Sequence, residues 1–162
     1  MNKIAFIILT IFMFFFKSSV MANYDKVFYD FKIEGISGEI INLSDYKNKV
    51  VLYGCGGDRD ITKRPKIAKT VSKYSSLQLI TDDNPRNENP KSIRDTLLRN
   101  SKNAISIANR EKAIKYGVKL IKKKKGILIV AGKGHENTQI IKNKIIKFSD
   151  QLIIKKYAEN IW

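Results

Sequence analysis

Three short polar segments each follow an apolar run, and all three carry residue types that bind ligands. They are residues 54–60 (Gly-Cys-Gly-Gly-Asp-Arg-Asp), 81–86 (Thr-Asp-Asp-Asn-Pro-Arg) and 131–136 (Ala-Gly-Lys-Gly-His-Glu). Ligands of open α/β sheets bind outside the carboxyl ends of the strands. If the three apolar runs are parallel strands, the three segments therefore form one site at a single rim.

The charged side chains of these segments have both signs. Arg59 and Arg86 supply guanidinium groups, and Asp83 and Glu136 supply carboxylates. A guanidinium group binds a carboxylate with two parallel hydrogen bonds, and an acidic side chain pairs with an ammonium group. A site with both signs suits a zwitterion, which means an amino acid.

Two common phosphate-binding motifs are excluded. A dinucleotide-binding GxGxxG pattern would need glycine at position 59, where Arg59 stands, and a Walker loop would need Ser or Thr after Lys133, where Gly134 stands. The only cysteine, Cys55, excludes an internal disulfide and a cysteine-based zinc site, and the only histidine, His135, excludes an HExxH zinc motif.

Several of these residues have plainer interpretations. Asp58 and Asp60 either cap the helix that follows or bind a ligand, and the sequence leaves both open. Lys133 and His135 are interpreted as members of a tight glycine turn rather than as catalytic groups. Cys55 is interpreted as a small buried residue rather than a nucleophile.

From about residue 50 onward, apolar runs alternate with helical patterns. This predicts a Rossmann-like α/β fold, an open and mostly parallel sheet with helices on both faces. We expect Asn109 to cap the third helix, Gly126 to end it, a hairpin over residues 139–148 to turn at 143–144, and Ser149-Asp150 to cap a last helix. The expected strands are 50–53, 77–81, 104–108 and 127–131, and the expected helices are 64–74, 91–100 and 109–123.

The first 49 residues differ in style. Residues 1–22 have the plan of a secretory signal peptide, with Lys3, thirteen mostly apolar residues at 4–16 and small residues before position 23. An uncleaved anchor is the alternative, and after cleavage no stable membrane span is expected. Residues 23–49 form a separate short β segment, with strands expected at 29–35 and 40–43.

The net charge of +16 comes from 31 Lys and Arg residues against 15 Asp and Glu residues. Such an excess favours nucleic acid, anionic surfaces or anionic small molecules. The lysines are scattered through every segment without interleaved aromatic residues, which is also typical of lysine-rich codon usage. We therefore expect no specific nucleic acid partner.

The three segments, together with Lys63-Arg64-Pro65, resemble successive motifs of the Mur ligase family in order and in approximate spacing. The similarity covers about residues 50–162 and corresponds to the C-terminal domain of ligases that add meso-diaminopimelate to UDP-N-acetylmuramoyl-alanyl-glutamate. The Asp-Asn-Pro-Arg tetrapeptide at 83–86 is the mark of diaminopimelate rather than lysine addition. The resemblance implies a Mur ligase C-terminal fold of the Rossmann-like type.

The resemblance also implies roles for particular residues. Arg86 would pair with a carboxylate of meso-diaminopimelate, Arg59 would be a second cationic contact, and Gly132 and Glu136 would hold the distal end of the substrate. No catalytic residue and no metal ligand is implied within this chain. The implied substrate-binding residues are Arg59, Asp83, Asn84, Pro85, Arg86, Gly132 and Glu136.

In this family ATP phosphorylates a peptide carboxylate, and the amine of diaminopimelate attacks the acyl phosphate. The family uses ATP and magnesium in a central domain that has no counterpart in these 162 residues. We therefore expect no cofactor in this chain, no peptide-bond formation by the chain alone, and the remaining ligase domains as possible partners. The family works in the cytoplasm whereas the leader predicts export, and the sequence does not resolve this conflict.

Residues 24–52 have a weaker similarity to the start of glutathione peroxidase-like proteins. The similarity ends before the redox cysteine, because Cys55 lies too close to the Val51-Leu52 strand and the sole tryptophan is Trp162. The chain thus resembles two families joined near Leu52. Two alternatives to a ligase fragment stay open, namely an exported thiol peroxidase and an exported basic module that binds anionic polymers.

Overall fold

The computed structural model describes residues 32–34, 40–42, 46–124 and 126–159, and the chain divides into two units, residues 1–45 and 46–162. In the first unit β1 (Lys32–Glu34) pairs antiparallel with β2 (Ile40–Asn42). These strands lie within the predicted ranges 29–35 and 40–43. The predicted leader, residues 1–22, lies outside the described residues.

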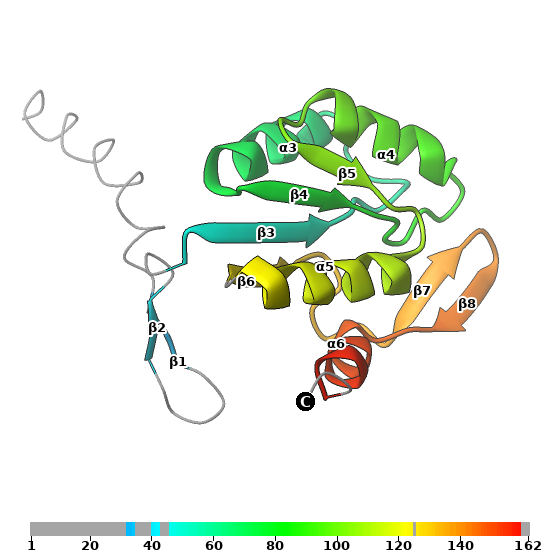
Figure 1. Ribbon diagram of the computed structural model, residues 1–162. Helices are drawn as coiled ribbons and strands as arrows, with labels where there is room; N and C mark the ends of the chain where they lie inside the picture. The colour runs from blue at the N-terminus through cyan, green and yellow to red at the C-terminus, as the bar shows by residue number, and fades with distance from the viewer. Residues whose placement is uncertain (1–31, 35–39, 43–45, 125, 160–162) are drawn as a thin grey trace, which may run out of the picture. The chain divides into compact units, whose positions relative to one another are not determined.

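The second unit contains a four-stranded parallel sheet with the strand order β5-β4-β3-β6 (Figure 1). The predicted α/β class and the parallel sheet are confirmed. Each strand except β6 is followed by a helix before the next strand of the sheet begins. The strands are β3 (Asn48–Tyr53), β4 (Leu77–Ile80), β5 (Ala104–Ser106) and β6 (Gly126–Val130), and the helices between them are α3 (Lys63–Tyr74), α4 (Pro90–Arg99) and α5 (Arg110–Lys124).

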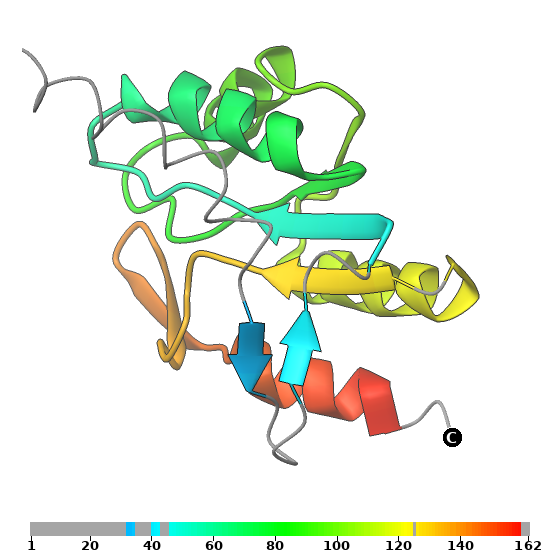
Figure 2. The same cartoon turned by 90° about the vertical axis from the view of Figure 1, so that its left-hand side faces the viewer.

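The chain continues after β6 into a hairpin and a last helix. The hairpin joins β7 (Thr138–Ile141) to β8 (Lys144–Lys147), and α6 (Asp150–Glu159) follows. Figure 2 shows β3 and β6 side by side, with the hairpin at the end to which both arrows point. The hairpin therefore lies at the carboxyl edge of the sheet, where the three polar segments also begin.

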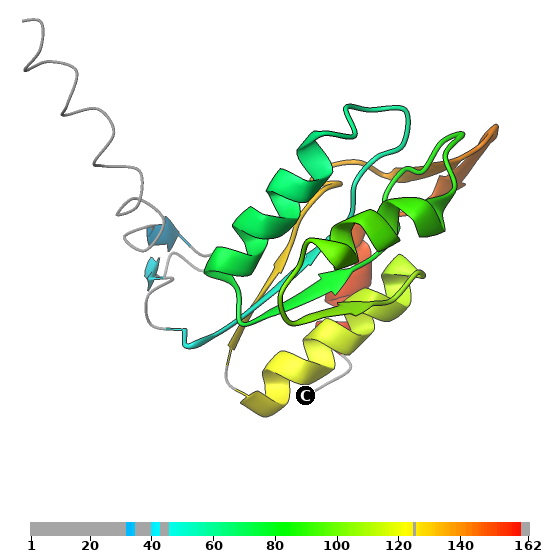
Figure 3. The ribbon, with the colours of Figure 1, turned by 90° about the horizontal axis from the view of Figure 1, so that it is seen from above.

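Helices cover both faces of the sheet, with α3 and α4 on one side and α5 on the other (Figure 3). Alternate residues of β3 explain this, since successive side chains of a strand point to opposite faces. Val50 and Leu52 pack into the core beneath α5, which also contains Leu79, Ala113 and Ile114. Tyr53 packs into the core beneath α3 and α4, which contains Ala68, Ile80, Ile93 and Leu97.

Local sequence signals set three helix starts. The Asn89 side chain accepts a hydrogen bond from the Lys91 amide at 2.9 Å, and Pro90 occupies the first helical position of α4. The Asn109 side chain accepts one from the Lys112 amide at 2.8 Å, so the predicted cap of α5 is confirmed. Ser149 accepts from the Leu152 amide at 3.5 Å at the start of α6.

Two details of the prediction were wrong. Gly126 does not end a helix but is the first residue of β6, where a Cβ atom would lie 2.4 Å from the Asn48 carbonyl oxygen of the paired strand. The hairpin turns at Lys142 and Asn143 rather than at 143–144, and Lys142 adopts a φ of 52°. Both corrections depend on pairing between strands, which a local pattern does not specify.

Within the described residues, no helix has the length and apolar character needed to cross a membrane.

We expect Leu79→Ala to destabilise the second unit by about 2–5 kcal/mol, because Leu79 is completely buried in β4 and truncation leaves a cavity. Urea denaturation followed by far-ultraviolet circular dichroism measures this loss. Leu98→Ala is the matched control, since Leu98 is 38% exposed on α4 and its truncation should cost much less. Equal losses in the two variants would contradict the assignment of Leu79 to the core.

Candidate functional site

The first two polar segments lie against each other at the carboxyl edge of the sheet. The Gly57 amide donates a hydrogen bond to the Asn84 carbonyl oxygen at 2.8 Å. A Cβ atom at Gly54 would lie 2.4 Å from the Thr81 carbonyl oxygen, so only glycine permits this approach. The predicted meeting of segments 54–60 and 81–86 is therefore present in the structure.

Lys133 joins the third segment to the second. Its side chain is 0% exposed, and its Nζ donates hydrogen bonds to Asn84 Oδ1 and to the Thr138 carbonyl oxygen, both at 2.8 Å. The same ammonium lies 3.3 Å from Asp83 Oδ1 and 3.6 Å from Glu136 Oε2. A buried ammonium needs such partners, because removing an isolated charge from water is costly.

Asn84 is the second centre of this network. Its Oδ1 accepts from the Ile140 amide at 3.0 Å as well as from Lys133, and its Nδ2 donates to Glu136 Oε2 at 2.8 Å. Both ends of the amide are thus engaged, and the side chain is almost fully buried. The predicted site residues Asn84 and Glu136 are in direct contact, with Glu136 still 44% exposed on its side chain.

Asp83 and Gly132 face each other across the same network. The Asp83 carbonyl oxygen accepts from Gln139 Nε2 at 2.6 Å, while its buried Oδ1 has only the ion-pair contact with Lys133 and no hydrogen bond of good geometry. Gly132 has a φ of 118°, and a Cβ atom there would lie 2.9 Å from Asp83 Oδ2. Gly132 is thus required both by its backbone conformation and by the Asp83 carboxylate.

Arg86 and Arg59 approach each other at Gly56. Arg86 Nη1 donates to the Gly57 carbonyl oxygen at 2.8 Å. A Cβ atom at Gly56 would lie 2.8 Å from Arg86 Nη1 and 3.6 Å from Arg59 Cγ. The Arg86 guanidinium and the Arg59 side-chain stem therefore both lie beside Gly56. Arg59 also lines a hollow of about 460 Å³, together with Cys55 and Lys63.

The backbone of Arg86 connects the site to the hairpin. Its φ is 50°, its amide donates to the Ile140 carbonyl oxygen at 3.2 Å, and its carbonyl oxygen accepts from the Lys142 amide at 2.7 Å. Pro85, fully buried beside it, fixes the turn. The hairpin thus holds the backbone of Arg86, while its side chain contacts the glycine segment.

Two ion pairs that support the site were missed by the sequence analysis. Arg64 on α3 forms a two-pronged pair with Glu88 at 2.7 and 2.8 Å and donates to the Gly56 carbonyl oxygen at 3.1 Å. Arg110 on α5 forms a similar pair with Asp150 and donates to the Ala131 carbonyl oxygen at 2.9 Å. Each arginine holds one glycine segment in place. Arg64-Pro65 and the predicted cap at Asp150 were noted in the sequence, but nothing local indicates their partners.

Of the remaining candidates, Asp58 and Asp60 make structural contacts. Asp60 accepts from the Thr62 hydroxyl and amide, which lowers the pKa of its carboxyl group and forms a turn before α3. Asp58 accepts from Asn87 Nδ2 at 2.9 Å. His135 is exposed. Burial raises the pKa of the Cys55 thiol, which favours the unreactive protonated form. No group of three or more metal-ligating side chains occurs in the part of the chain that the structure describes.

Comparison with known proteins gives the class to which this fold and site belong. Residues 38–134, more than half of the chain, match the family model described as the Mur ligase glutamate ligase domain. The chain therefore belongs to the Mur ligase family and represents its C-terminal domain. The predicted family and fold type are confirmed.

Individual relatives carry one printed name, UDP-N-acetylmuramoyl-L-alanyl-D-glutamate--2,6-diaminopimelate ligase. The protein of that name from Rickettsia typhi is 45% identical over 122 residues, which cover 74% of this chain, and that from Rickettsia montanensis is 48% identical over 118 residues, which cover 72%. A solved structure with the same name superposes with a TM-score of 0.65 at 30% identity over 70% of this chain. The chain spans about a quarter of the length of these relatives.

We expect Lys133→Met to cost about 3–5 kcal/mol of unfolding free energy, because it leaves the Asp83 and Glu136 carboxylates without their shared cation. Chemical denaturation measures the loss. Lys112→Met on the exposed face of α5 is the control, and we expect it to change stability by no more than about 0.5 kcal/mol. A loss of the same small size at position 133 would show that the ammonium does not hold the loops together.

The Arg64–Glu88 pair predicts a pH dependence. The hydrogen bonds from Arg64 lower the pKa of the Glu88 carboxyl group below its ordinary value of about 4.3. The unfolded chain then binds more protons than the folded chain, so the stabilisation is complete above that ordinary value and is lost as the pH falls through the lowered one. Denaturation between pH 2 and 6 should show a shallower acid loss for Glu88→Gln than for the unaltered protein. Identical acid profiles would contradict the pairing.

Proposed function

We propose that this chain binds meso-diaminopimelate at the site formed by residues 54–60, 81–86 and 131–136. In this proposal the chain acts as the substrate-presenting domain of an ATP-dependent ligase that extends a peptidoglycan precursor. The phosphorylation step would belong to domains outside the described residues, so the chain alone would bind the amino acid without forming a peptide bond.

The observation that carries the proposal is that both signs of charge occur at one edge of the sheet, with Arg86 and Arg59 beside Gly56 and the Asp83 and Glu136 carboxylates beside Lys133. Diaminopimelate has an ammonium group and a carboxylate at each end, so its recognition needs both signs of charge. Arg86 and Arg59, whose side chains both pass beside Gly56, suit a carboxylate. Glu136, with its side chain 44% exposed beside Asn84, suits the ammonium group of the distal end.

The relatives support the choice of amino acid. The proteins from Rickettsia typhi, Rickettsia montanensis and Anaplasma marginale are 42–48% identical to this chain and carry 2,6-diaminopimelate in their printed name. The tetrapeptide Asp-Asn-Pro-Arg at residues 83–86 lies at the centre of the site, with Asp83 and Asn84 contacting Lys133 and Arg86 contacting Gly57. The selection of diaminopimelate over lysine would then depend on Arg86, since lysine lacks the second carboxylate.

We expect meso-diaminopimelate to bind with a Kd on the order of 1 mM, equivalent to about −4 kcal/mol. A ¹H–¹⁵N NMR titration should shift the amides of the three loops, and Arg86→Ala should abolish the shifts by removing the carboxylate partner. Arg86→Lys, which keeps the charge but loses the planar fork, should weaken binding about tenfold.

Arg99→Ala is the matched control, because Arg99 is exposed at the end of α4 and contributes nothing to the three loops. It should leave the titration unchanged. Equal shifts with lysine and with diaminopimelate would contradict the proposed specificity, and undiminished shifts in Arg86→Ala would contradict the proposed role of the arginine.

A further inference from the structure

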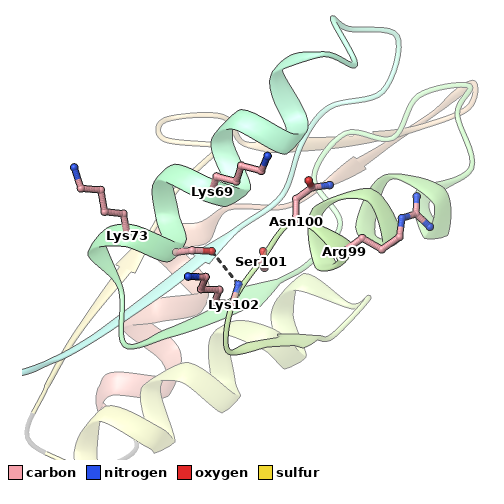
Figure 4. A pocket seen from close by; sticks show the side chains of 7 residues that line it. Lys69, Lys73, Arg99, Asn100, Ser101 and Lys102 are labelled. Atoms are coloured by element: carbon pink, nitrogen blue, oxygen red, sulfur yellow. Dashed lines mark hydrogen bonds between the residues drawn. The ribbon is translucent and has the colours of Figure 1, made fainter.

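A second hollow lies away from the three-loop site. It has a volume of about 520 Å³ and is formed where α3 ends, where α4 ends and where the chain runs toward β5 (Figure 4). These element ends lie at the amino edge of the sheet, opposite to the loops that follow β3, β4 and β6. We call this hollow the basic groove. Its lining residues are Lys69, Ser72, Lys73, Arg99, Asn100, Ser101 and Lys102.

The basic groove has four cations and no acidic residue in its lining. Lys73 and Arg99 occupy the last turns of α3 and α4, where cations complement the helix dipole. That explanation does not extend to Lys69, which lies a turn further back, or to Lys102, which lies beyond α4. Neither of these two ammonium groups is within ion-pair distance of a carboxylate in residues 46–124 or 126–159.

The acidic residue that lies near the groove on α4 is already engaged. Asp95 pairs with Lys91 at 2.7 Å, and the hydrogen bond from Lys91 lowers the pKa of the Asp95 carboxyl group. Arg99 lies one turn after Asp95, and its charge affects the Asp95 carboxyl group less than Lys91 does. The lining of the groove therefore carries four positive side chains and no negative one.

The floor of the basic groove is held by a buried polar network. Ser72 Oγ accepts from Gln78 Nε2 at 2.7 Å and from the Lys102 amide at 3.0 Å. Gln78 is fully buried, and its Oε1 accepts from Ser101 at 3.1 Å and from the Tyr53 hydroxyl at 2.8 Å. Because α3, β3, β4 and the segment after α4 all contribute, the backbone positions that carry the cations are fixed relative to one another.

The cations of the groove spread rather than converge. Figure 4 shows Lys73 and Arg99 pointing away from each other at the two sides of the groove, with Lys69 between them and directed toward Asn100. A single small anion would contact only one or two of these groups. A chain of regularly spaced negative charges would contact several of them at once.

We infer that the basic groove binds a linear phosphate polyanion through its backbone. Phosphate oxygens are good partners for lysine and arginine, and a polymer gains affinity from each counterion that it releases. The lining contains no aromatic side chain on which a nucleobase could stack, so recognition is independent of bases. This site is separate from the amino-acid site, and it gives part of the high net charge of +16 a specific use.

The test compares two variants of the 162-residue chain that lose the same charge. Lys69→Gln/Lys102→Gln removes two exposed cations of the groove, and Lys112→Gln/Lys119→Gln removes two exposed cations of α5 on the other face of the sheet. The probes are inorganic polyphosphate and an oligodeoxythymidylate with the same number of phosphates. Binding is measured by fluorescence anisotropy from 50 to 300 mM salt.

We expect the groove variant to bind both probes about tenfold more weakly at 50 mM salt and to lower the salt slope by about 1.4, from two contacts at about 0.7 each. The α5 variant should bind within about twofold of the unaltered protein. Equal losses in the two variants would overturn the assignment to the groove. A more than tenfold preference for the oligonucleotide over polyphosphate would overturn recognition by the phosphate backbone alone, and loss of diaminopimelate binding in the groove variant would overturn the separation of the two sites.

Discussion

The arrangement of the carboxyl edge depends on one buried ammonium group. Lys133 has a side chain that is 0% exposed, and it reaches from the glycine turn after β6 to Asn84 after β4 and to the start of β7. Asp83, Asn84 and Glu136 all contact this group. A buried charge with several polar partners at fixed distances is stable only when all of the partners are present, so the loops are held as one unit.

Two further ion pairs anchor this unit to the helices. Arg64 connects the glycine segment after β3 to α3 and Glu88, and Arg110 connects the turn after β6 to α5 and α6 through Asp150. Arg59 and Glu136 face solvent, and these ion pairs hold the backbone segments that carry them. Such preorganisation lowers the entropic cost of binding a small flexible ligand.

The sequence predicts the elements well because their signals are local. Apolar runs gave the four strands, Asn109 gave the start of α5, and the polar segments at the strand ends gave the rim on which a site is expected. The role of Lys133 was not predicted, since one lysine among 31 basic residues carries no mark of burial. Arg110–Asp150 and Arg64–Glu88 join residues 40 and 24 positions apart, and Gly126 depends on the carbonyl of Asn48. These contacts follow from the packing of distant segments, which periodicity and capping rules do not describe.

The most direct test of the account is a crystal structure of the chain grown with saturating meso-diaminopimelate. The account predicts one ligand molecule across the three loops, with a carboxylate against the Arg86 guanidinium, an ammonium group against Glu136, and Lys133 still buried beneath Asn84. A ligand bound elsewhere, or a ligand at the rim that contacts neither Arg86 nor Glu136, would contradict the central claim that these loops form an amino-acid site.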